Sequence, residues 1–301
     1  MEKDKRQRMS QMRKFNNFWG YLFILPQLIG LVVFFLIPIG ITVYLCFENW
    51  DFINEPIFVG FSNFIEVFKD PVFIKTIGNT FFFVIGIVPL NLGLALFLAV
   101  MANRKIKFLG FFKASLFLPM VTSTVAISLI WYWIYAPDFG LLNLGLSFFG
   151  IAGPNWLSNP TWTKPALIIM CIWKGVGYSF LIFLAGLKGI STTYYEAASI
   201  DGANEIQKFK NVTLPLLSPV LFFMTVTSLI STFAIFNEAY MLTQGGPMYS
   251  SYTMMLYLYN YAFKFMKMGN ASVVAMFMAI IQITFAVIQF RLSRKWVNYD
   301  A

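Results

Sequence analysis

The chain of 301 residues contains no histidine at all. Zinc proteases need paired histidine ligands and serine hydrolases need a histidine base, so both classes are excluded. The dipeptide Gly-Lys never occurs either, although a P-loop that holds ATP contains it. No other nucleophile–base pair stands out. We therefore expect a protein that is not an enzyme, with no catalytic residue, no metal ligand and no cofactor of its own.

Charged residues are also scarce: Asp, Glu, Lys and Arg make up only 12% of the chain, and 58% of it is hydrophobic. A soluble domain carries about 25% charged residues. A helix needs about 20 apolar residues to cross a bilayer. Six runs reach this length: 15–47, 76–103, 114–137, 165–187 (interrupted only by Lys174), 211–237 and 268–290. The first run is too long for a signal-peptide core and lacks a small-residue cleavage site, so we expect a retained span.

A seventh uncharged stretch, 239–263, is interrupted by the polar segment 243–247 and by Ser250, Ser251 and Thr253. Its apolar pieces are short, which favours a re-entrant or interfacial segment over a span. Six spans place 16 lysines and arginines in loops on the cytoplasmic side and five in the outer loops. This asymmetry follows the positive-inside rule, and a seventh span would weaken it.

We therefore predict an all-α polytopic membrane protein with six transmembrane helices and both termini in the cytoplasm. Residues 1–14 form a basic cytoplasmic N-terminus, 15–290 the transmembrane domain and 291–301 a cytoplasmic tail. The net charge of +9 then lies beside anionic membrane lipid, which argues against a nucleic-acid partner. Cys46 and Cys171 fall within apolar runs and are expected to be packing residues.

Acidic side chains are absent from all six runs. Proton- and sodium-coupled carriers usually place carboxylates near the middle of the membrane as relays. A secondary transporter is therefore a less favoured alternative.

The most informative cytoplasmic segment is the loop 191–215, after the fourth run. Thr193 and Glu196 have the spacing of a capping box, which would start a short helix. Ala197 and Ala198 are small helix formers that would let a partner approach closely. The loop therefore predicts a short helix with a small-residue surface.

The second half of this loop contains a turn signal, Asp201-Gly202. Asp201 is placed to cap a second helix that begins near Ala203. Pro215 suits the first turn of the fifth span, where its missing N–H costs nothing. We expect a helix–turn–helix that lies along the membrane and is too polar to insert.

Glu196-Ala197-Ala198, Gly202 and Leu214-Pro215 resemble, in type and spacing, the EAA loop of binding-protein-dependent ABC importer permeases. Other features agree with this resemblance in order along the chain: Asn79-Thr80, Leu118-Pro119, Trp131, Gly140-Leu141-Leu142-Asn143, Trp173 and Gly245-Gly246-Pro247. The set resembles the carbohydrate-uptake branch, specifically the larger permease of maltose and multiple-sugar transporters. It implies a MetI-like transmembrane domain with the type I ABC importer permease fold.

The resemblance also implies several partners. A cytosolic ATPase dimer would bind ATP and magnesium, a second permease would complete the translocation path, and an extracytoplasmic binding protein would deliver a sugar or oligosaccharide. The chain would lie in the bacterial cytoplasmic (inner) membrane. The residues that would couple it to the ATPase are Glu196, Ala197, Ala198, Asp201, Gly202, Ala203, Leu214 and Pro215.

The same resemblance implies a sugar site, because positions that match Lys174, Gly175, Tyr178, Ser228 and Thr232 line it in maltose-type permeases. Lys174 and Thr232 depart from the maltose-type side chains, whereas the other three keep them. A lysine at the bilayer centre costs about 2.5–3.5 kcal/mol, and a polar cavity would remove most of this cost. Snorkelling or a partner subunit would also explain Lys174, and packing would explain Tyr178. An amino-acid or peptide importer permease remains the alternative within the superfamily.

Overall fold

The computed structural model describes residues 2–103 and 108–298, which are almost entirely helical. The elements are α1 (Glu2–Leu31), η1 (Val32–Leu36), α2 (Ile37–Leu45), β1 (Glu48–Asn49), β2 (Ile57–Phe58), α3 (Ser62–Lys69), α4 (Pro71–Ala102), α5 (Leu109–Val121), α6 (Thr124–Ile134), α7 (Leu141–Ser147), α8 (Pro160–Gly189), α9 (Thr192–Ile200), α10 (Glu205–Lys208), η2 (Phe209–Thr213), α11 (Leu214–Leu216), α12 (Ser218–Phe233), α13 (Asn237–Thr243), α14 (Met254–Tyr259), η3 (Asn260–Lys264) and α15 (Met268–Ser293). The side chains of 1–14, and residues 104–107 and 299–301, lie outside the described part.

Four unbroken helical stretches are long and apolar enough to cross a membrane: Asn17–Leu45, Pro71–Ala102, Pro160–Gly189 and Met268–Ser293. Two bent pairs complete a set of six if each pair is one span: Leu109–Val121 with Thr124–Ile134, and Glu205–Leu216 with Ser218–Phe233. Each stretch or pair overlaps one of the six uncharged runs. The prediction of an all-α membrane protein with six spans is therefore confirmed.

The third span is not the single straight helix that the run 114–137 suggests, because its axis turns by 102° between α5 and α6. Thr122 and Ser123 have non-helical ψ angles of 145° and 128°. The Thr122 hydroxyl donates to the Leu118 carbonyl at 2.8 Å, and Pro119 offers no N–H to the preceding turn. Both features weaken the helix where it breaks, and an apolar run does not reveal such a bend.

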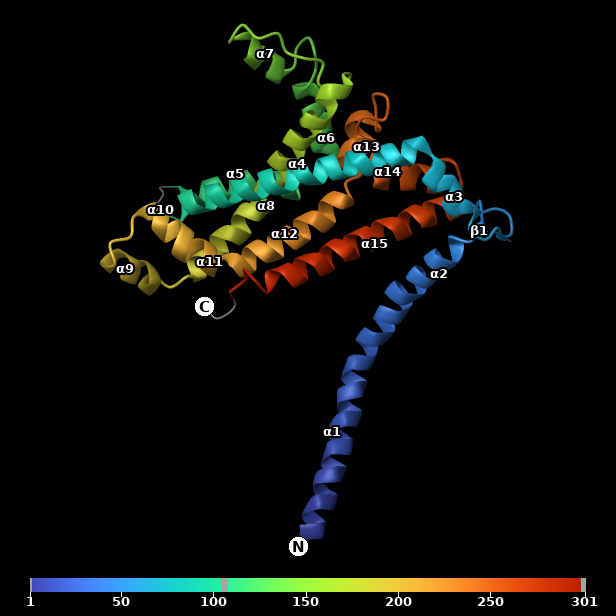
Figure 1. The fold of residues 1–301 in the computed structure, drawn as a ribbon, viewed down its shortest axis with the longest axis vertical. Coiled ribbons are helices and arrows are strands. Elements are labelled where there is room, and N and C mark those ends of the chain that lie inside the picture. The colour runs from blue at the N-terminus through green and yellow to red at the C-terminus, as the bar shows by residue number, and fades with distance from the viewer. Residues whose placement is uncertain (1, 104–107, 299–301) are drawn as a thin grey trace.

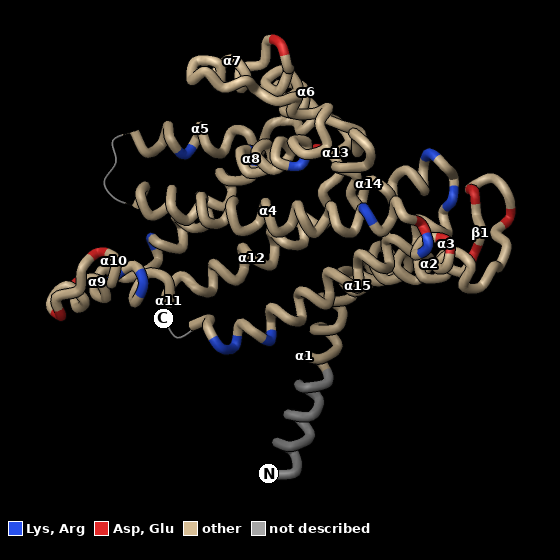
Figure 2. Tube along the Cα trace, turned by 45° about the horizontal axis from the view of Figure 1, so that its top comes forward, with Lys and Arg blue, Asp and Glu red and all other residues tan. Residues whose placement is uncertain are grey.

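The helical body is built around α4 and α8, which contact each other along much of their length, while α12 contacts both α4 and α15 (Figure 1). Small residues of α4, Ala95 and Ala99, let the helices approach, and Phe180 and Phe183 of α8 fill the space between them. All four side chains are fully buried. The charged residues lie mostly at the ends of the helices and in the loops, as Figure 2 shows.

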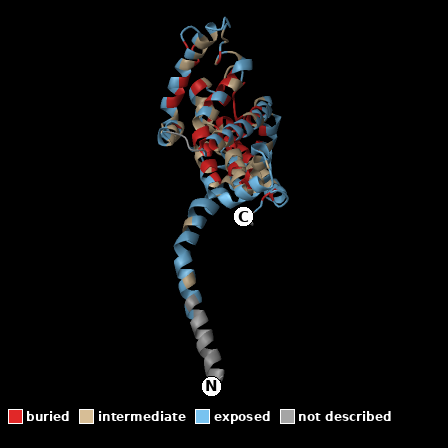
Figure 3. Ribbon diagram, turned by 90° about the vertical axis from the view of Figure 1, so that its left-hand side faces the viewer, coloured by how far each residue is buried: buried red, intermediate tan, exposed pale blue. Residues whose placement is uncertain are grey.

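The first span, α1 to α2, is an arm that leaves this body (Figure 3). Of its most apolar stretch only 6% is buried, compared with 44% for α4 and for α8. A helix that is apolar on all sides needs lipid or another subunit around it. The arm therefore contributes little to the chain's own core.

The stretch 239–263 forms the short helices α13 and α14 rather than a span, as the sequence predicts. The loop between them folds onto α4. Asn79 donates to the carbonyls of Tyr249 and Tyr252 at 2.8 and 2.9 Å, and Thr80 accepts from the Met254 N–H at 3.0 Å. The Asn79-Thr80 pair thus fixes the loop that follows α13.

Candidate functional site

A cavity of about 540 Å³ lies among α4, α5, α6, α8, α12 and the start of α13. Small-molecule sites usually measure about 300–1,000 Å³. Residues that carry hydroxyls line it from three helices: Thr124, Ser179, Thr227, Ser228, Ser231 and Thr232. The cavity is therefore large and polar enough for a small hydroxylated ligand.

The structure brings all five residues of the predicted substrate path to this one cavity. Lys174, Gly175 and Tyr178 reach it from α8, and Ser228 and Thr232 reach it from α12. Ser228 and Thr232 are one helical turn apart, so they share a face. Their common location agrees with the prediction, whereas their role in binding sugar stays a prediction.

Lys174 is paired rather than snorkelling. Its ammonium donates to the Glu238 carboxylate at 2.8 Å and to the Thr124 hydroxyl at 2.6 Å. The two charged side chains are 19% and 14% exposed. The pair joins α8 to α6 and α13, and neutralises the charge of Lys174 inside the protein.

Glu238 is a cavity residue that the sequence reasoning missed, because it lies one position beyond the run 211–237. A signal was present: a lysine inside a span requires a counter-charge, and Glu238 is the first acid after the fifth run.

The structure also gives Gly175 a packing role. A Cβ there would lie 3.1 Å from the Asn91 amide nitrogen, and Asn91 itself accepts from the Ser179 hydroxyl at 2.7 Å.

The loop 191–215 forms α9, but its capping differs from the prediction. Ser191, not Thr193, is the N-cap, and its hydroxyl accepts from the Thr193 N–H at 3.3 Å. The predicted Thr193–Glu196 capping box is therefore wrong. Serine and threonine are both good caps, and the residues here offer two overlapping choices.

The predicted turn at Gly202 is confirmed, with φ of +79°. The N–H of Ala203 donates to the Ala198 carbonyl at 2.9 Å, and the N–H of Gly202 donates to the Ser199 carbonyl at 3.1 Å. This pair of bonds is the Schellman motif, in which a glycine in the left-handed region ends a helix. Gly202 thus closes α9 and redirects the chain.

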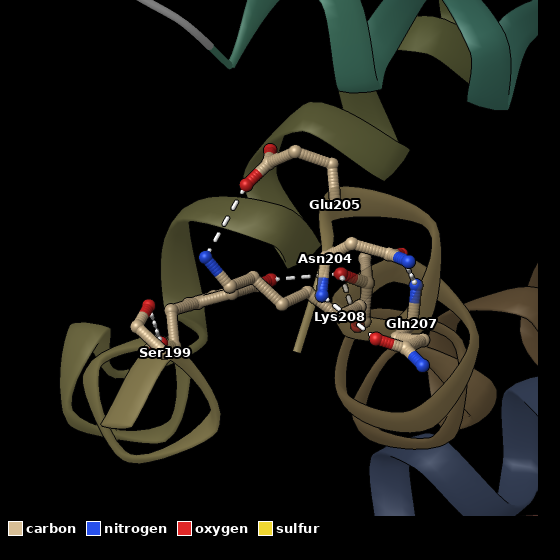
Figure 4. Close-up of polar contacts among 7 residues, drawn as sticks. Ser199, Asn204, Glu205, Gln207 and Lys208 are labelled. Carbon is tan, nitrogen blue, oxygen red and sulfur yellow. Dashed lines mark hydrogen bonds and ion pairs between the residues drawn. The ribbon is translucent and has the colours of Figure 1, made fainter. Parts of the chain in front are cut away.

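Asp201 does not cap the start of the next helix, contrary to the prediction, because it is the C-cap of α9. Asn204 takes that role. Its side chain accepts from the Gln207 N–H at 2.9 Å, while the Gln207 side chain accepts from the Asn204 N–H at 2.8 Å (Figure 4). The capping box of this loop therefore lies at Asn204 and Gln207, where asparagine and glutamine replace the commoner Ser/Thr and Glu.

Pro215 lies near the end of a helical stretch, 205–216, and not at the start of the fifth span as predicted. The chain bends by 66° after this stretch, and α12 begins at Ser218 with Pro219 in its first turn. The Ser218 hydroxyl donates to the Pro215 carbonyl at 2.6 Å across the bend. Leu214 and Pro215 therefore belong to an elbow between the helical stretch 205–216 and α12.

The face of this loop is exposed and partly apolar. Glu196 and Ala197 are exposed, as are Ile200 and Ile206, whose side chains are 87% and 78% exposed. A hydrogen bond of 3.1 Å between the hydroxyls of Tyr195 and Thr213 ties α9 to η2. The loop is thus held together by this hydrogen bond and exposes isoleucine side chains, as a docking surface does.

Residues 91–298 match the family described as "Binding-protein-dependent transport system inner membrane component". The chain is 39% identical to the probable ABC transporter permease protein YesP of Bacillus subtilis, over 99% of this chain and 97% of that protein. It is 35% identical to the lactose transport system permease protein LacF of Rhizobium radiobacter, over 95% and 97% of the two chains.

The fold is also found among solved structures. A chain in the crystal structure of a bacterial ABC transporter for the acidic polysaccharide alginate superposes with a TM-score of 0.81, over 97% of this chain and all of that one, at 23% identity. This likeness shows the ABC importer permease fold. Together with the match over residues 91–298, it establishes that the chain belongs to the inner-membrane permeases of binding-protein-dependent ABC transport systems.

Proposed function

We propose that this permease imports a sugar through the cavity among α4, α8 and α12. The observation that carries the proposal is the convergence of Lys174, Gly175, Tyr178, Ser228 and Thr232 on one cavity of about 540 Å³. Relatives named for lactose and for starch degradation products support a carbohydrate substrate.

The chemistry of the cavity suits a sugar. Ser228 and Thr232 present hydroxyls on one face of α12, and a sugar hydroxyl can both donate to and accept from them. Tyr178 offers an aromatic face for the C–H side of a pyranose together with a hydroxyl. Because Lys174 and Glu238 neutralise each other, the described wall of the cavity carries no net charge.

Transport would be driven by a separate ATPase that docks on the loop 191–215. The exposed Ile200 and Ile206 provide apolar contact area for it. Gly202 and the elbow at Pro215 would pass its motion to α12, which forms one wall of the cavity. The site would then alternate between the two sides of the membrane, together with a second permease and with a sugar-binding protein on the outer side.

The proposed orientation places both termini in the cytoplasm of a bacterial cell, in its cytoplasmic membrane. It rests on the excess of 16 lysines and arginines over five on the opposite side. The loop 191–215 then faces the ATPase, and α3, α13 and α14 face the binding protein.

The test is a double variant, Tyr178→Ala with Ser228→Ala, in the complete transporter. Each lost hydrogen bond is worth about 0.5–1.5 kcal/mol, so together they should lower sugar uptake by about tenfold or more. Complex assembly and the ATPase activity stimulated by the binding protein should remain largely intact. The matched control is Tyr132→Ala with Ser115→Ala, outside the cavity. Normal uptake by the double variant, or failure to assemble, would show that these residues are structural.

A further inference from the structure

Six aromatic rings contact one another in series and form what we call the aromatic row: Phe236, Tyr240, Tyr259, Phe263, Phe52 and Trp50. Its inner part is a cluster of three rings. Phe236, directly before α13, and Tyr240, on α13, are stacked with centroids 5.3 Å apart. Tyr259, at the end of α14, lies 4.8 Å from Phe236 and 5.6 Å from Tyr240.

The outer part leads to the β1–β2 hairpin. Phe263 lies 5.3 Å from Tyr259, Phe52 lies 6.5 Å from Phe263 in a stacked arrangement, and Trp50 lies 4.9 Å from Phe52. Phe263 and Phe52 are 57% and 44% exposed. Phe263 and Phe52 are therefore the most open rings of the row, while Trp50 at its end is partly buried.

The inner end of the row belongs to the cavity, because Phe236 is one of the residues that line it. The outer end belongs to the side that carries few lysines and arginines. In Figure 1, α13, α14 and the β1 hairpin follow one another from the middle of the body to the end where α2 meets α3. The row thus connects the cavity with the outer surface.

The tyrosine hydroxyls in the cavity and the aromatic row differ from the other buried or partly buried tyrosine hydroxyls in their hydrogen bonding. Eight tyrosines of the described residues are buried or partly buried, and five of them have a hydrogen-bond partner for the hydroxyl: Tyr135, Tyr195, Tyr252, Tyr257 and Tyr261. Within residues 2–103 and 108–298, the other three have none. They are Tyr178 in the cavity and Tyr240 and Tyr259 in the row. These three hydroxyls are not among the buried side-chain atoms that lack a partner, so they are accessible and can bond to water or to a ligand.

We propose that the aromatic row extends the substrate path outward from the cavity and takes the pyranose rings of an oligosaccharide. The inference rests on the proposed sugar transport. Aromatic faces pack against the apolar C–H faces of a pyranose, and tyrosine hydroxyls bond to its rim. An aromatic belt at the membrane surface is the competing explanation, but a belt lies at one depth, whereas this row runs from the cavity to the hairpin.

The first test needs no sugar. In the assembled transporter with Cys46 and Cys171 replaced by alanine, a water-soluble maleimide should label Tyr259→Cys and Phe263→Cys from outside. The matched control is Ile283→Cys, on the membrane-spanning α15 and 62% exposed in this chain, which should stay unlabelled. No labelling at either row position would mean that lipid or the second permease covers the row, and would overturn the proposal.

The second test uses labelled sugars of increasing length: lactose, and maltose to maltotetraose. Tyr259→Ala should lower uptake of the longest transported sugars at least fivefold and that of disaccharides by less, whereas Tyr259→Phe, which retains stacking and loses only the hydroxyl, should lower it less than Tyr259→Ala does. An equal effect at every length, or loss of the second permease from the purified complex, would overturn the proposal. If the wild type transports none of these sugars, the proposed function fails first, and the inference fails with it.

Discussion

The ammonium of Lys174 and the carboxylate of Glu238 lie 2.8 Å apart, although 64 residues separate them in the chain. Both side chains are largely buried, so each would be a costly isolated charge without the other. Glu238→Ala should therefore destabilise the protein strongly, by about 3 kcal/mol or more, since breaking a buried pair leaves one charge uncompensated. Thermal unfolding of the purified complex in detergent measures this loss.

A double variant separates the cost of a lone charge from the value of the pair itself. Lys174→Met combined with Glu238→Leu removes both charges, and it should regain most of the stability lost in Glu238→Ala. If the double variant unfolds at the same temperature as Glu238→Ala, an uncompensated charge on Lys174 is not the cause of the lost stability.

Gly202 is the position where the loop 191–215 depends on backbone conformation alone. Its φ is +79°, and a Cβ there would meet nothing within 4 Å. Gly202→Val should therefore strain the turn without a clash, leaving membrane insertion normal but abolishing uptake and substrate-stimulated ATP hydrolysis. Gly202→Asn should retain much of both, because asparagine tolerates the left-handed region.

Gly189 provides the matched control for that experiment. It ends α8 close to the same loop, it too has nothing within 4 Å of a Cβ, and its φ is outside the left-handed region. Gly189→Val should leave uptake near the wild-type level. Wild-type uptake in a well-expressed Gly202→Val complex would refute the coupling role.

Gly177 permits the close contact between α8 and α5. A Cβ at this position would collide with the backbone carbonyl of Leu116, which cannot move aside as a flexible side chain would. Gly177→Ala should therefore lower the yield of folded protein severely. Gly93→Ala is the control, because nothing lies within 4 Å of its Cβ. Equal yields of the two variants, measured by fluorescence size-exclusion chromatography, would contradict this packing.

The apolar runs were sufficient to predict the number and place of the spans, because the bilayer fixes the length of an uncharged helix. They did not predict the 102° bend at Thr122 and Ser123, since hydroxyl residues inside a run leave its hydropathy nearly unchanged. The length of an apolar run predicts that a helix can span the membrane, whereas the bend depends on individual hydrogen bonds.

The location of the cavity residues could be predicted from a resemblance, but the partner of Lys174 could not. Glu238 follows a run by one residue, and only the fold of α13 brings it back against α8. The predicted helix caps at Thr193 and Asp201 were wrong for a related reason. Ser191, Thr193, Asp201 and Asn204 are all capable caps, and local sequence does not decide which of them is used.

The topology can be tested without the transport partners. A reporter fused to the C-terminus and active only outside the cytoplasm should give no signal, because both termini are expected inside. The same reporter inserted into the loop between α6 and α8 should be active. Strong activity from the C-terminal fusion would contradict the orientation.

ATP-driven uptake by the complete transporter decides whether this permease imports a sugar through the cavity. The chain is reconstituted into vesicles with its second permease, ATPase and binding protein, and labelled sugars and labelled amino acids are offered in parallel. Accumulation of a sugar that requires ATP and the binding protein, and that is lost in the Tyr178→Ala, Ser228→Ala variant, is the predicted result. Accumulation of an amino acid instead, or sugar uptake that the double variant retains in full, would contradict sugar import through this cavity.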